Sequence, residues 1–372
     1  MFSAKLLHNP SEEDGAAKTF DTILELISSA REKIAIHMYV WRSDAIGNRI
    51  GEALFKAAER GVKIEIIKDL SAMMYERIEM NRKSYLPREP GTKRKLWWRT
   101  VRPTFPDTFV EDEFRNGAGH RLIGHPDVKL TWTEDAHTHT KYYLFDDRDL
   151  VTGSINIEER HRGYFDYMVH LGAENLGEHF RARESGERDP DPEREIEFIF
   201  NQTMHGQQRF EIKPELLRLL NKAKREIHIE VAYIGDSDID AAIGAAAHRG
   251  VEVNLLLSKK ANIGNDNNYR SAQKLLKSAP VKIFLTPRMI HSKMIAFDRT
   301  TVFSGSANTS IFSMCQSAEL NLLIREPRLI ADFLAVADSR KALSSKVQSP
   351  DDLNAYNKPL ALLQELHQKL KL

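Results

Sequence analysis

The sequence predicts an α/β protein built from two related lobes, and three observations support this prediction. A strand, helix, strand pattern occurs once in each half of the chain, and a polar motif also occurs twice at a constant separation. The chain has 372 residues, of which 41% are hydrophobic and 29% are charged. This is ordinary globular composition, with enough residues for two compact units, and it argues against collagenous, coiled-coil and disordered classes.

The first half contains an apolar strand from Ile34 to Trp41, an amphipathic helix that ends at Arg60-Gly61, and a second apolar strand. Residues 223–260 repeat this order, and the corresponding helix ends at Arg249-Gly250. The pairs Ser43-Asp44 and Ser237-Asp238 occupy matching places before the two helices. Each half therefore predicts a βαβ unit, in which a crossover helix joins two parallel strands.

The repeated motif is H-x-K-x4-D-x6-G-S-x-N. It runs from His139 to Asn156 and from His291 to Asn308 without gaps, and every corresponding residue is separated by 152 positions. Two matches of this length exclude coincidence. Each lobe is therefore expected to carry one copy of the motif.

A charged stretch at 181–195 contains two prolines and predicts the boundary between lobes, with the first at 1–185 and the second at 195–345. The first lobe carries about 37 extra residues, inserted at about 70–110. After Asp351 the leucine spacing favours a terminal helix, and we assign 346–372 to a C-terminal packing helix.

The motif has the composition of a phosphate site. If His and Lys lie two positions apart in a strand, they project from the same face, and the turn at Asp146 or Asp298 then brings Ser and Asn back beside them. Donors and fixed cations without grouped carboxylates suit a phosphate rather than a Mg²⁺ or Ca²⁺ cage. We therefore expect neither a metal nor another cofactor.

Two histidines on one phosphorus can divide the chemistry, because one imidazole attacks while the protonated other supplies a proton to the leaving oxygen. Motif symmetry alone does not choose between them. Carboxylates that follow each motif are predicted to orient the histidines, and the motif aspartates are interpreted as turn residues rather than direct catalysts. The predicted catalytic set is His139, Lys141, His291, Lys293, Asn156, Asn308, Asp166 and Glu319, with Ser154, Ser306, Asp146 and Asp298 in supporting roles.

The doubled motif resembles the phospholipase D superfamily over about residues 20–345, and residues 34–69 are most similar to bacterial cardiolipin synthases. The resemblance implies two α/β/α sandwiches of mixed sheet related by pseudo-two-fold symmetry, with one active site at the lobe interface. It further implies two-step transfer through a phosphohistidine, with His139 as nucleophile and His291 as acid. The segment after Asn308 departs from the usual cardiolipin synthase pattern and leaves the acceptor alcohol open.

The function expected from this resemblance is metal-independent transfer of a phosphatidyl group from phosphatidylglycerol to an alcohol. The alternatives are a phospholipase D hydrolase and a phospholipase D-family nuclease. A non-enzymatic lipid-binding scaffold is disfavoured, because a scaffold has no physical need for two intact motifs. Since one chain holds both motifs, we expect it to function as a monomer.

The insertion includes a strongly basic segment, Arg82 to Arg102, with eight Lys or Arg and one Glu. Its cations attract anionic lipid headgroups, and Trp is favoured at membrane interfaces. We interpret it as a membrane-docking segment, with nucleic-acid binding and simple surface packing as alternatives. The residues assigned to docking are Lys93, Arg94, Lys95, Trp97 and Trp98.

The remaining features concern location and partners. The chain has one cysteine, Cys315, shows no secretory signal and has no apolar run of membrane-spanning length. We therefore expect a cytoplasmic protein at the inner face of the membrane, with anionic phospholipids as partners. The net charge of +1 gives little support to nucleic acid as a partner. His137, which forms an H-x-H with His139, is not assigned to a metal, because no matching ligand set accompanies it.

Overall fold

The structure is a computed structural model, and it divides into two compact units. The first comprises Met1–Gly163 and Tyr167–Arg181, and the second comprises Tyr164–Asp166 and Ala182–Leu372. The residues described are 2–8, 15–72, 75–76, 84–86, 88, 91–92, 96, 118–133, 137–189, 191, 194–204, 207–262, 265–353 and 356–362. The prediction of an α/β protein with two related lobes is confirmed.

The first unit holds a mixed sheet in the strand order β1-β8-β7-β6-β2-β3-β4. Strands β2, β3 and β4 are parallel, and the other pairs are antiparallel. Its elements are β1 (Ser3–Leu7), α1 (Ala17–Ser29), β2 (Lys33–Met38), α2 (Ala45–Glu59), β3 (Lys63–Asp69), α5 (Ala118–Ile123), β4 (Val128–Thr133), β5 (His137–Thr138), β6 (Tyr142–Phe145), β7 (Asp149–Gly153), the 3₁₀ helix η3 (Glu159–Gly163), β8 (Met168–Gly172) and α6 (Leu176–Ser185).

The second unit repeats this order as β9-β16-β15-β14-β11-β12-β13, with β10 and β17 added at the two edges. Its elements are β9 (Ile196–Met204), β10 (Gln207–Phe210), α7 (Ile212–Lys222), β11 (Glu226–Glu230), α8 (Ser237–His248), β12 (Glu252–Ser258), α9 (Asn265–Ser278), β13 (Lys282–Thr286), β14 (Met294–Phe297), β15 (Thr301–Gly305), α10 (Ile311–Cys315), β16 (Ser317–Ile324), α11 (Pro327–Ala342), β17 (Ser345–Lys346) and the 3₁₀ helix η4 (Pro350–Leu353). The predicted βαβ unit is present in each half as β2-α2-β3 and β11-α8-β12.

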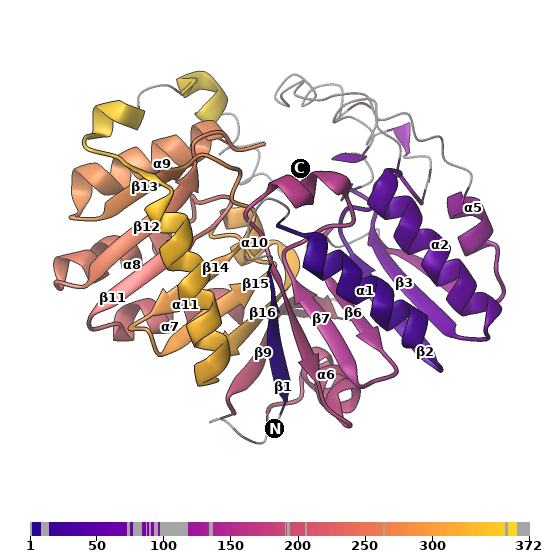
Figure 1. Cartoon of the computed structure of the whole chain (residues 1–372). Helices are drawn as coiled ribbons and strands as arrows, with labels where there is room; N and C mark the ends of the chain where they lie inside the picture. The colour runs from indigo at the N-terminus through magenta and orange to yellow at the C-terminus, as the bar shows by residue number, and fades with distance from the viewer. Residues whose placement is uncertain are drawn as a thin grey trace. The chain divides into compact units, whose positions relative to one another are not determined.

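Helices cover both faces of each sheet (Figure 1). In the first unit, alternate residues of β2 such as Ile34 and Ile36 face the core under α1 and α2, while Tyr142 of β6 faces Phe180 of α6 on the other side. In the second unit, Ile227 and Ile229 of β11 face the core under α7 and α8, and Glu230 faces α11. The period-two alternation of strands thus produces three layers in each unit.

The crossover helices begin at side-chain caps. Asp44 accepts a hydrogen bond from the Gly47 amide at the start of α2, and Asp236 accepts from the Asp238 and Ile239 amides at the start of α8. The sequence repeat matched Asp44 with Asp238, but Asp238 lies in the first turn of α8. The capping residue is instead Asp236, two positions earlier.

The turns after β6 and β14 are the most similar feature of the two repeats. Asp146 and Asp298 have left-handed φ values of 47° and 52°, and the residue after each is also left-handed. Such turns match the twist of a hairpin, and Asp tolerates the left-handed region. Each hairpin therefore returns the chain along the strand that carries the Gly-Ser-x-Asn segment.

Three boundaries differ from those expected. The motif His and Lys precede β6 and β14 instead of lying in them. Helix α6 continues to Ser185, so the first residues of the expected linker are helical. The segment assigned to a helix at 346–372 instead begins with the end of β17 and the 3₁₀ helix η4, and its described α-helical residues are 358–362. Residues 363–372 lie outside the described part. Among the described residues, no helix is long and apolar enough to span a bilayer.

Candidate active site

In the first unit, the motif histidine and lysine lie in the connection between β5 and β6. Lys141 is fully buried, and its Nζ donates a hydrogen bond of 2.7 Å to the His139 carbonyl oxygen. Tyr39, directly after β2, packs edge-on against the His139 ring at 4.8 Å between centroids. The Tyr39 ring also lies 5.3 Å from Lys141 Nζ. Tyr39 therefore contacts both motif residues, which the sequence did not indicate.

Asn156 follows β7 and lies beside Val40 and His161. Its Oδ1 accepts from the Val40 amide at 3.3 Å, and its Nδ2 lies 3.3 Å from His161 Nε2. His161 in turn lies 3.0 Å from Glu158, whose other carboxylate oxygen pairs with the buried Arg42. Burial raises the pKa of Glu158, but Arg160 and Arg42 outweigh it and hold that pKa well below its usual range. The ionised carboxylate is the acceptor for an Nε2 proton of His161, and the same nitrogen cannot then accept from the Asn156 amide. The hydrogen bond that orients the Asn156 side chain is therefore the one from the Val40 amide.

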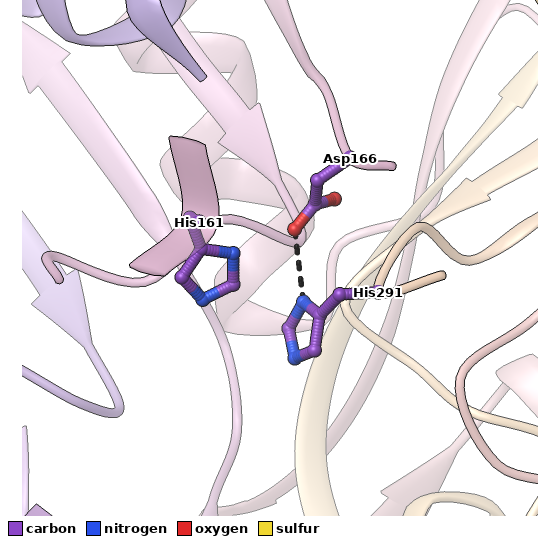
Figure 2. A group of neighbouring side chains, drawn as sticks. All are labelled: His161, Asp166 and His291. Carbon is purple, nitrogen blue, oxygen red and sulfur yellow. Dashed lines mark hydrogen bonds and ion pairs between the residues drawn. The ribbon is translucent and has the colours of Figure 1, made fainter. Parts of the chain in front are cut away.

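In the second unit, His291 is paired with a carboxylate. Figure 2 shows the Asp166 side chain directed at the His291 ring, and Nδ1 donates to Oδ2 at 2.9 Å. Asp166 is fully buried and His291 is 6% exposed. The sequence selected Asp166 because it follows the first motif, but its partner is the histidine of the second motif. With Nδ1 engaged, Nε2 is the ring nitrogen left for proton transfer.

Lys293 lies beside the same ring, with Nζ 3.3 Å from Nδ1 and 3.4 Å from Nε2 of His291. Nζ also donates to the His291 carbonyl oxygen, as Lys141 does to that of His139. Burial lowers the pKa of Lys293 to about 8, although the charges of Asp166 and Glu319 oppose this shift. The ammonium is therefore close to its titration point near neutral pH.

In the second unit, Asn308 ends the motif and Glu319 lies eleven residues further on, in β16. Ser306, directly after β15, donates from Oγ to the Glu319 carboxylate and accepts from the Leu320 amide at 2.9 Å, so this serine holds the carboxylate in place. The Asn308 side chain is buried, and within the described residues its Oδ1 has no hydrogen-bond partner. A buried amide oxygen without a partner is uncommon and indicates a place for a ligand.

The motif aspartates bond to the backbone. Asp146 accepts from the amides of Arg31, Glu32 and Lys33 at 2.8 to 2.9 Å, and Asp298 accepts likewise from residues 224–226. Burial raises the pKa of each aspartate, but these amide donors outweigh it and hold both pKa values below the usual range. Each aspartate ties its hairpin to the entrance of β2 or β11, which is a structural role.

Ser154, predicted as a supporting residue, donates to the Tyr167 carbonyl at 3.4 Å. His137, which was not assigned to a metal, lies 3.2 Å from Ser71. The docking residues Lys93, Arg94, Lys95, Trp97 and Trp98 lie outside the described residues. Tyr39, Tyr164, Glu230 and Arg340 contact site residues but lie outside both motifs, so the motif pattern did not select them.

Each of the two related α/β units carries a histidine-lysine pair and a buried asparagine side chain. These are the groups of an enzyme that acts on phosphate esters. The family described as "Cardiolipin synthase, PLD-like domain" matches residues 23–181 and 216–340, and the chain belongs to this family. It is therefore a phospholipase D-type enzyme, a phospholipid phosphatidyltransferase at the level of the family. The resemblance inferred from the doubled motif is confirmed.

Individual relatives agree with this assignment. The chain is 25% identical to cardiolipin synthase B of Salmonella typhi over 82% of this chain and 74% of that protein. It is 23% identical to cardiolipin synthase B of Escherichia coli K12 over the same shares. The crystal structure of phosphatidylserine synthase from Haemophilus influenzae has a TM-score of 0.68 at 12% identity, and the match covers 98% of this chain and 95% of that one. That likeness supports the fold.

Proposed function

We propose that this enzyme transfers the phosphatidyl group of phosphatidylglycerol to an alcohol acceptor through a phosphohistidine at His139. The observation that carries the proposal is the bond between Asp166 and His291 beside the buried Lys293. A histidine held at Nδ1 by a carboxylate is suited to move a proton at Nε2. His291 is therefore assigned the acid and base steps, which leaves His139 as the nucleophile.

In the first step a bond forms between phosphorus and the His139 ring, and the bond between phosphorus and the glycerol oxygen breaks. His291 gives its proton to that oxygen, and glycerol leaves. In the second step the acceptor oxygen attacks phosphorus, its proton passes to His291, and the bond to His139 breaks. Lys141, Lys293 and the amides of Asn156 and Asn308 stabilise the charge on the phosphoryl oxygens. If the acceptor is a second phosphatidylglycerol, the products are cardiolipin and glycerol.

The partners and location of the enzyme belong to the same proposal. Its donor is an anionic lipid, so we place the enzyme at the inner face of the membrane, acting as a monomer. The basic segment, with Trp97 and Trp98, would hold it there.

The test is mass spectrometry of products after incubation with phosphatidylglycerol vesicles in EDTA. Cardiolipin and glycerol are expected from the native chain and none from His139→Ala. His170, whose Nε2 bonds Asp149 at 2.7 Å, offers a matched control, and His170→Ala should retain turnover. In His291→Ala, the phosphatidyl group should accumulate as a covalent adduct on His139.

Other outcomes would contradict the proposal. Phosphatidic acid alone would mean a hydrolase. Full turnover in His139→Ala would reject the nucleophile, and loss of activity in EDTA would reject the metal-independent mechanism. If no product depended on His139, phosphatidylglycerol would not be the donor, and other donors, including nucleic acid, should be tested.

A further inference from the structure

Arg340 is a fully buried arginine near the end of α11, far in sequence from either motif. A buried guanidinium is tolerated only when its charge and its N–H donors have partners. The partners of Arg340 converge on the residues that surround the bond between His291 and Asp166.

Three polar contacts fix the guanidinium. Nη1 donates to Glu230 Oε2 at 2.8 Å and to Ser292 Oγ at 3.3 Å, and Nη2 donates to the Asp166 carbonyl oxygen at 3.2 Å. Ser292 Oγ itself donates to Glu230 Oε2 at 3.1 Å. Nη1 of the guanidinium thus bonds to Ser292, the residue next to His291, and Nη2 bonds to the backbone of Asp166.

Asp166 depends on such contacts because of where it lies in the chain. Tyr164–Asp166 belongs to the second unit, although the chain on either side belongs to the first. This three-residue segment is held by the Phe165 amide, which donates to Met289 O at 2.8 Å, and by the His291 amide, which donates to Phe165 O at 2.9 Å. The Phe165 ring packs on Leu256 and Ile290, and the guanidinium carbon of Arg340 lies 5.1 Å from its centroid.

We propose that Arg340 is a positioning residue that aligns Asp166 with His291. It touches neither substrate nor a reacting atom, and it acts by fixing the carbonyl of Asp166 and, with Glu230, the Ser292 side chain. Its effect on turnover rests on the function proposed above. Its effect on the hydrogen bond does not.

Arg340→Lys separates alignment from charge. One ammonium can still pair with Glu230, but it lacks the planar fork that reaches Glu230 and the Asp166 carbonyl together. We expect kcat to fall about 10- to 100-fold, as when residues behind a reacting group are altered, with KM nearly unchanged. The downfield proton resonance of His291 Nδ1–H, assigned by its absence in His291→Ala, should be lost as in Asp166→Asn.

The control is Arg183→Lys. Arg183 is also buried in the second unit, but its Nη2 donates to Phe198 O at 3.2 Å and to Glu211 at 3.4 Å, away from Tyr164–Asp166. It should keep both the resonance and kcat. If Arg340→Lys fails to fold, Glu230→Gln with Arg340→Met removes both buried charges and should also lose the resonance.

A native resonance in a folded Arg340 variant would overturn the inference. So would equal losses in Arg340→Lys and Arg183→Lys, because general destabilisation would then explain both. If the native chain produced no cardiolipin but Arg340→Lys still lost the resonance, the positioning role would stand and the proposed function would fall.

Discussion

At the scale of single residues, each lysine of the motif is held by the carbonyl of its own histidine, two positions earlier. Lys141 and Lys293 share this bond, and the ammonium stays beside the ring although neither residue lies in a strand. The sequence predicted the pairing from strand geometry, whereas a local side-chain bond to the backbone produces it. The two predicted orienting carboxylates then differ from one another, although both belong to the second unit, since Asp166 bonds to His291 while Ser306 holds Glu319.

Lys293 leads to a prediction about pH. Its pKa is lowered to about 8, so the ammonium that we propose to stabilise phosphoryl oxygens is lost as pH rises through about 8. We expect kcat/KM to fall by up to about tenfold per pH unit above this value, because each unit above the pKa leaves about a tenth as much of the charged form. Steady-state assays from pH 6 to 10 would measure it.

The pH dependence of folding stability that Lys293 contributes is opposite to that of activity. Between about 8 and the ordinary value of 10.5 the unfolded chain binds more protons at this lysine, so the contribution rises with pH. Loss of activity without loss of thermal stability would support the assignment. An activity that stays flat to pH 10 would contradict it.

At the scale of elements, the hairpins β6-β7 and β14-β15 are tied to the strands beside them by the motif aspartates. Asp298 connects the turn after β14 to residues 224–226 at the entrance of β11, and β11 pairs directly with β14. The strand that follows the motif histidine is therefore fixed to the middle of the sheet. This explains why the motif includes an aspartate that does not bond to the histidine.

Asp298→Ala should test this role. It removes the acceptor of three amides and places alanine at a φ of 52°, so we expect a loss of about 2 kcal/mol in the free energy of unfolding. Denaturant unfolding would measure it, and turnover per folded molecule should stay within about tenfold of native. Asp298→Gly, which relieves the backbone strain alone, should recover part of the stability. Abolished turnover in a fully stable Asp298→Asn would instead indicate direct catalysis.

At the scale of the whole molecule, charge is nearly balanced, with 54 Lys or Arg against 53 Asp or Glu. Any electrostatic attraction to an anionic membrane must therefore come from a local cluster. The segment from Arg82 to Arg102 is the strongest such cluster in the sequence.

Neutralising Lys93, Arg94 and Lys95 to Gln should weaken binding to phosphatidylglycerol vesicles. At about 1 kcal/mol for each cation near an anionic surface, three changes predict a loss of up to about 100-fold at low salt, diminishing as salt is added. Cosedimentation at several salt concentrations would measure it. A matched triple change at the exposed Lys56, Lys63 and Lys129 should have a smaller effect. Equal losses in both variants would assign binding to general charge, and unchanged binding would reject the docking role.

The repeat, the α/β class and the residues of the two motifs could be predicted from sequence, because hydrophobic periodicity and fixed spacing are local properties of the chain. The role of Asp146 and Asp298 as turn residues also followed from local chemistry. The pairing of Asp166 with His291 could not be predicted, because these residues are 125 positions apart. Asp166 and Glu319 follow equivalent motifs at similar distances, so their positions do not show which histidine each one contacts.

Only the tertiary structure decided that pairing. Tyr164–Asp166 packs into the second unit, where Phe165 finds an apolar site and Arg340 bonds to the Asp166 carbonyl. Tyr39 and Arg340 carry no motif signal, because an aromatic after a strand and an arginine in a helix are common features. Their roles arise from contacts between elements distant in the chain, and such contacts are set by packing and by the need to pair buried charge.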